Sequence, residues 1–117
     1  MNDKKVTDLN YLTDTMGERK PLMKEVMAVF LKHFPQEIKD LNYHIEKETY
    51  SEIKYFSHRM KSSSSIMGIK RLSEVLEQIE GFARGERDIH LIKKLNSQVN
   101  SIGEKAIEEI KLEIKNY

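Results

Sequence analysis

Apolar residues recur every three or four positions through most of this chain, and this spacing constrains the fold more than any other feature of the sequence. A repeat of that length places apolar side chains on one face of an α-helix, whereas a half-buried strand would need alternation at every second residue. The repeat is clearest in the second half of the chain. It comprises Leu72, Val75, Leu76, Ile79, Phe82 and Ala83, followed by Ile92, Leu95, Val99, Ile102, Ala106 and Ile110. The sequence therefore predicts an all-α fold.

Glycine, proline and capping residues divide the periodic regions into helices. Five helices are predicted, over residues 8–17, 19–47, 49–67, 69–84 and from 88 toward the C-terminus. Pro35 should kink or interrupt the second of them, because proline lacks a backbone N–H. The apolar spacing resumes with Ile38, Leu41 and Ile45, so we expect one bent helix to about Lys47. Four long amphipathic helices joined by short turns predict an antiparallel four-helix bundle, with the short N-terminal helix covering one end. We expect a single domain over residues 1–117, with residues 1–6 disordered.

The composition bears on location and partners. The 117 residues include no cysteine, which excludes disulfides and thiolate metal sites and suits a reducing compartment. Twenty lysine and arginine residues balance nineteen aspartate and glutamate residues without a basic stripe, so nucleic-acid binding has no electrostatic support. No stretch approaches the roughly 20 apolar residues needed to cross a bilayer. We therefore expect a cytoplasmic protein that binds neither nucleic acid nor membrane.

The segment 56–68 contains four consecutive serines, yet the apolar residues in and around it follow helical spacing. These apolar residues are Ile53, Phe56, Met60 and Met67. At about 100° per residue, His58 lies roughly opposite them on the helix. Lys54 and Ser62, one turn to either side, and Lys61, three residues on, lie beside His58. An imidazole held in water between cations and a small residue is an unusual position for a structural histidine.

The order of residues in this segment resembles the signature of the histidine-containing phosphotransfer (HPt) domain family. That signature consists of His, two residues, Lys, a small residue, further small residues, an apolar residue and Gly. Here it reads His58-Arg59-Met60-Lys61-Ser62-Ser63-Ser64-Ser65-Ile66-Met67-Gly68. The resemblance implies that His58 is phosphorylated, that Lys61 stabilises the phosphoryl group by its charge, and that Ser62 leaves room for a partner. The resemblance extends over nearly the whole chain and implies the same bundle architecture.

Glu80 is the second position that the resemblance singles out. Members of the family often carry Gln or Glu twenty-two residues after the phosphorylated histidine, and that position here is Glu80. The implied role of Glu80 is to accept a hydrogen bond from one ring nitrogen of His58, so that the other nitrogen can attack. A solvated surface glutamate is the alternative interpretation of Glu80.

The remaining histidines, His33, His44 and His90, lack the lysine and small-residue neighbours of His58. We expect them to be surface or packing residues. No two histidines are separated by one helical turn, so no metal site is predicted. A glycine-rich phosphate loop is also missing from the sequence, so neither an ATP site nor another cofactor is expected.

Together these features predict a monomeric phosphoryl carrier rather than an enzyme. The partners implied by the resemblance are response-regulator receiver domains, between which the phosphoryl group would pass, and a hybrid histidine kinase. One alternative is a helical adaptor that binds a receiver or kinase domain without being phosphorylated. Another is the phosphoacceptor domain of a kinase, which the start of the chain at Met1 without an attached catalytic domain disfavours.

Overall fold

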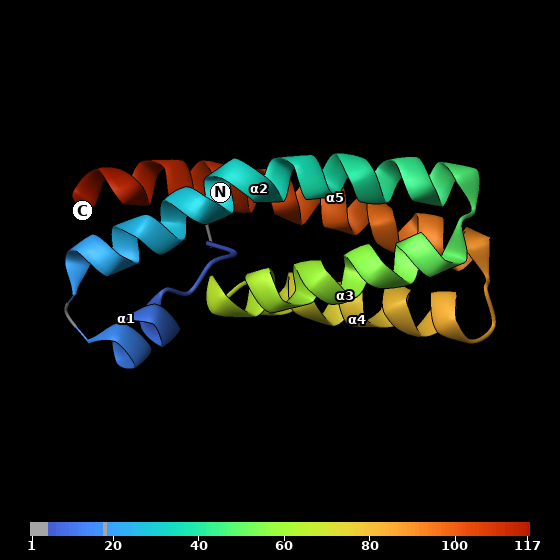
Figure 1. Ribbon diagram of the computed structural model, residues 1–117, viewed down its shortest axis with the longest axis horizontal. Coiled ribbons are helices and arrows are strands. Elements are labelled where there is room, and N and C mark those ends of the chain that lie inside the picture. Colours follow the sequence, from blue (N-terminus) through green and yellow to red (C-terminus); the bar gives the residue numbers. More distant parts are fainter. Residues whose placement is uncertain (1–4, 18) are drawn as a thin grey trace.

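The computed structural model describes residues 5–17 and 19–117 (Figure 1). The helices are α1 (Asn10–Met16), α2 (Lys20–Lys47), α3 (Tyr50–Ile66), α4 (Lys70–Arg84) and α5 (Ile89–Glu113), followed by the short 3₁₀ helix η1 (Ile114–Asn116). The described residues include no strand, so the predicted all-α fold is confirmed. Within these same ranges, no helix combines the length and the apolar character needed to span a membrane.

The four long helices form the predicted antiparallel bundle. Helix α2 packs against α3 and α5, and α4 packs against the same two helices. Figure 1 shows α2 and α5 along one edge of the bundle and α3 and α4 along the other. The core comprises Leu12, Met23, Met27, Phe30, Phe34, Ile38, Leu41, Ile45, Ile53, Met60, Met67, Ile69, Leu72, Val75, Leu76, Ile79, Ala83, Ile92, Val99, Ala106 and Ile110. Leu12 is the contribution of α1, which covers the end of the bundle as predicted.

Helix α2 continues through Pro35 to Lys47, so the prediction of one helix across this position is confirmed. Figure 1 shows the first and second halves of α2 inclined to each other, which fits a single bent helix. Proline removes one helical hydrogen bond. The neighbouring side chains of Phe34 and Ile38 are buried in the core, and this packing offsets the loss.

An N-terminal strap, defined here as residues 5–9, ties the ends of three helices together. The backbone N–H groups of Val6 and Thr7 donate to the Glu109 carboxylate of α5 at 2.8–3.1 Å, and the Thr7 hydroxyl donates to it at 2.7 Å. The Asp8 N–H donates to the Met67 carbonyl, at the turn between α3 and α4, at 3.3 Å. Disorder was expected for residues 1–6. Residues 1–4 lie outside the described residues, whereas Lys5 and Val6 contact α5.

Leu76→Ala is expected to lower the free energy of unfolding by about 2–5 kcal/mol, because the Leu76 side chain is completely buried and its loss opens a cavity. Urea denaturation measures this difference. Leu112, with 65% of its surface exposed, is the matched control, and Leu112→Ala should cost less than about 0.5 kcal/mol. Equal losses for the two variants would contradict the assigned core.

Phe56 is less buried than the helical spacing suggested. The innermost line of α3 consists of Ile53, Ser57, Met60 and Ser64. Phe56 lies beside that line, where its ring stacks on His44 with the ring centroids 5.5 Å apart. Phe56→Ala should therefore destabilise the protein less than Leu76→Ala.

Candidate functional site

The packing of α3 determines where His58 lies. Four side chains on the opposite side of the helix are buried, and two of them are serines whose hydroxyls bond to their own helix: Ser57 donates to Ile53 O at 2.7 Å and Ser64 donates to Met60 O at 2.8 Å. Small side chains at these positions allow α4 to approach closely. The His58 side chain remains 65% exposed, on the side of α3 nearest Glu80.

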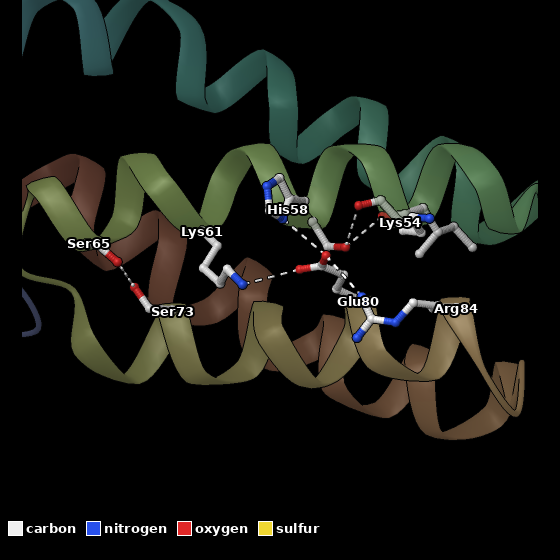
Figure 2. Close-up of polar contacts among 9 residues, drawn as sticks. Lys54, His58, Lys61, Ser65, Ser73, Glu80 and Arg84 are labelled. Carbon is white, nitrogen blue, oxygen red and sulfur yellow. Dashed lines mark hydrogen bonds and ion pairs between the residues drawn. The ribbon is translucent and has the colours of Figure 1, made fainter.

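Glu80 projects from α4 toward His58 (Figure 2). Its side chain is only 9% exposed, and its two carboxylate oxygens contact different residues of α3. His58 Nδ1 lies 3.0 Å from Glu80 Oε2, and Lys61 Nζ donates to Glu80 Oε1 at 3.3 Å. The structure thus brings His58, Lys61 and Glu80 into one cluster, with Glu80 in the position that the family resemblance implied.

The charge state of Glu80 follows from these contacts. Burial opposes ionisation and alone would raise the pKa of the carboxyl, but the hydrogen bond and charge of Lys61, together with His58, outweigh burial and lower the pKa of Glu80 below its ordinary value. Glu80 is therefore a carboxylate at neutral pH. A carboxylate can only accept hydrogen bonds, so the bond with His58 requires the ring proton on Nδ1. In this tautomer Nε2 carries the free lone pair.

Ser62 lies one turn after His58 on the exposed side of α3. Together with Lys61, it lines a shallow groove between α3 and α4 whose other residues include Ser65 and Ser73. The two latter hydroxyls lie 3.2 Å apart and connect the two helices. Because the side chain at position 62 is small, it leaves the exposed face of His58 uncovered.

Arg84 also belongs to the cluster, although no sequence motif singled it out. Its Nη1 lies 3.5 Å from Glu80 Oε2, the oxygen that also accepts from His58. The Glu80–Arg84 spacing of four residues is a recognisable helical ion pair, but it becomes informative only when Glu80 is known to be buried. The Glu80–Arg84 spacing was therefore visible in the sequence, but it could not be distinguished from an ordinary surface ion pair.

A separate ion pair, which does not involve Glu80, lies on the other flank of His58. Arg59 donates from Nε to Glu37 Oε2 at 2.9 Å and from Nη1 to the Tyr55 hydroxyl at 2.9 Å. Glu37 belongs to α2 and is 8% exposed. This bridge fixes α3 against α2, as Glu80 fixes α3 against α4.

The other histidines have different surroundings. His33 and His90 are exposed, and His44 Nδ1 lies 2.8 Å from the Thr49 hydroxyl. Over residues 5–17 and 19–117, no group of three His, Cys, Asp or Glu side chains has the arrangement of a metal site.

Comparison with known proteins gives the family. No curated protein sequence matches the chain significantly. The structure is similar to the crystal structure of histidine-containing phosphotransfer protein B (HptB) from Pseudomonas aeruginosa PAO1, with a TM-score of 0.86, 17% sequence identity, and coverage of 95% of this chain and 96% of that one. At this identity the likeness establishes the fold. A family model described as the Hpt domain matches residues 25–114, most of the sequence, and the chain therefore belongs to the Hpt domain family.

Proposed function

We propose that this Hpt domain carries a phosphoryl group on His58 Nε2 between response-regulator receiver domains of a phosphorelay. The observation that carries this proposal is an exposed imidazole whose Nδ1 is bonded to a buried carboxylate, with Lys61 on the same carboxylate. Holding Nδ1–H fixes the ring orientation and leaves Nε2 as the nucleophile. Exposure allows a second protein to bring its phosphoaspartate to the ring.

The transfer step follows from this arrangement. The Nε2 lone pair attacks phosphorus, an N–P bond forms, and the O–P bond of the aspartyl phosphate breaks, with its electron pair returning to the aspartate carboxylate. The ring keeps its Nδ1 proton and becomes a phosphoimidazolium, whose positive charge faces Glu80. Transfer to the next receiver reverses these bond changes. The receiver supplies its own acidic cluster and metal ion, so the chain acts as a carrier without an ATP site.

The partners that fit this proposal are receiver domains and a hybrid histidine kinase. We include in the proposal a monomeric state and a cytoplasmic location. The cysteine-free composition favours the cytoplasmic location. Nearly balanced charge likewise disfavours nucleic acid as a partner.

Lys61→Ala is expected to leave the fold intact and to slow phosphorylation or shorten the lifetime of the phosphohistidine. The transfer rate or the lifetime should fall by roughly fivefold to 150-fold, which corresponds to about 1–3 kcal/mol, because a charge-assisted contact to the phosphoryl group disappears. Rates of transfer to and from a receiver measure it. Lys93→Ala removes the same charge from an exposed position on α5 and should change little. Unchanged rates for Lys61→Ala in both directions would remove Lys61 from the site.

The experiment that tests the proposed function uses Ser62, because a receiver must approach within bonding distance of His58. A phosphorylated receiver is mixed with the wild type, Ser62→Ala or Ser62→Leu, and the label on this chain is followed over time. The wild type and Ser62→Ala should accept the label, whereas Ser62→Leu should remain helical and accept it very slowly. A wild-type chain that accepts no label would contradict the function. Normal acceptance by Ser62→Leu would limit Ser62 to a packing role.

A further inference from the structure

The Glu80 carboxylate has a cation on each of its oxygens (Figure 2). Lys61 Nζ lies 3.3 Å from Oε1, and Arg84 Nη1 lies 3.5 Å from Oε2. The two cations come from different helices, since Lys61 belongs to α3 and Arg84 to α4. Of these two cations, Lys61 is the one that lies one turn from His58 on the same helix, where it can reach a group attached to the ring.

After phosphorylation, two negatively charged groups compete for Lys61: the phosphoryl group and the Glu80 carboxylate. The incoming phosphoryl group adds one net negative charge to the cluster, and it lies beside Lys61 on the exposed side of α3. If Lys61 turns toward the phosphoryl oxygens, Glu80 Oε1 loses its partner. Without Arg84, Glu80 would then face only the phosphoimidazolium ring, whose positive charge is offset by its own phosphoryl group, and a carboxylate that is only 9% exposed is costly to leave so weakly compensated.

Arg84 supplies a second cation for the Glu80 carboxylate. It contacts Oε2, so Lys61 can leave Oε1 without disturbing it. With Arg84 present, the phosphoimidazolium, Glu80, Lys61 and Arg84 carry no net charge together. Without Arg84 the same groups would carry one excess negative charge near a buried carboxylate.

We propose that Arg84 is a positioning residue that retains the Glu80 carboxylate when Lys61 moves to the phosphoryl group, and thereby sets how strongly His58 holds that group. This inference rests on the proposed function. It assigns Arg84 an action through Glu80, with no contact to the phosphoryl group itself.

The test measures how the phosphoryl group divides between this chain and a receiver. Each variant is loaded chemically with phosphoramidate, so that loading does not depend on the receiver. It is then mixed with unphosphorylated receiver until the distribution is constant. The variants are Arg84→Gln, Arg84→Lys and the control Arg71→Gln, each in the wild-type and in the Glu80→Gln background. Arg71 lies in the first turn of α4 and pairs with Gln98 and Glu74 instead.

Arg84→Gln should shift the distribution toward the receiver by about tenfold, the size expected for a lost contact to a charged group. Arg84→Lys should stay close to the wild-type distribution, because lysine keeps the positive charge. Arg71→Gln should also resemble the wild type. In the Glu80→Gln background Arg84→Gln should change the distribution less than about twofold, since no buried charge is left when Lys61 moves. A purely structural role for Arg84 would not depend on the residue at position 80 in this way.

Two results would overturn the inference while leaving the proposed function intact. One is an Arg84→Gln protein that divides the phosphoryl group as the wild type does. The other is an equal loss in both backgrounds, which would mean that Arg84 contacts the phosphoryl group or the receiver directly. If the wild type loaded on His58 passes nothing to any receiver, the proposed function itself fails.

Discussion

Replacing His58 by glutamine is expected to abolish phosphoryl acceptance from a receiver while changing stability by less than about 1 kcal/mol. Glutamine has no ring, and its amide nitrogen is not a nucleophile. Its side-chain N–H can still donate to Glu80, and the His58 side chain is 65% exposed, so no core cavity opens. Labelled receiver and a thermal melt of the same preparation measure the two properties together.

His33→Gln is the matched control, since His33 is also exposed on a helix but lies on α2. It should accept the phosphoryl group at the wild-type rate. Label that persists on the His58→Gln protein would end the assignment of His58 as the acceptor. A large loss of stability in that variant would instead make His58 a structural residue.

Gly68→Ala is expected to destabilise the protein by about 2–4 kcal/mol, the combined size of left-handed backbone strain and a steric clash. Gly68 has φ of 67°, a region that residues with a Cβ rarely adopt. A Cβ at this position would also collide with the backbone carbonyl of Asp8 in the N-terminal strap. The strap would then have to leave the turn between α3 and α4.

Two other glycines separate these contributions in urea denaturation. Gly17 has φ of 63° and ψ of −143°, a conformation close to the region that is essentially restricted to glycine, and nothing lies within 4 Å of the added Cβ, so Gly17→Ala should show backbone strain without a clash, at about 1–3 kcal/mol. Gly81 lies inside α4 with equally open space, and Gly81→Ala should stabilise the protein by about 0.5–1 kcal/mol through helix propensity. If Gly68→Ala cost only about 1 kcal/mol, the size of left-handed backbone strain alone, the strap would not press on Gly68 in solution.

The helices were predictable because each carries its own local signals. Apolar spacing, Gly68, Gly85 and the cap at Asp88 all act within a few residues, and Asp88 indeed accepts from the Leu91 N–H at 3.2 Å. The exposure of His58 followed from the same periodicity. Glu80 came from the family resemblance, since spacing alone could not distinguish it from a solvated glutamate.

Contacts between distant segments were not predictable. The local sequence around Glu109 does not indicate a structural role, yet Glu109 anchors the strap across 103 residues of sequence. Asn42 of α2 accepts hydrogen bonds from Asn96 and Asn100 of α5 at 2.7 and 3.0 Å, a polar contact inside the bundle that no periodicity indicates. Such pairings depend on how the helices are rotated against each other, and that rotation cannot be derived from the residue pattern of a single sequence.

The most direct test of the account follows one phosphoryl group through the chain. A receiver carrying labelled phosphoaspartate is incubated with the wild-type protein and removed, and a second, unlabelled receiver is added. We expect acid-labile, base-stable label to appear on this chain, to map to His58, and then to move to the second receiver. A receiver that binds this chain while no label ever appears on it would contradict the account and favour a helical adaptor.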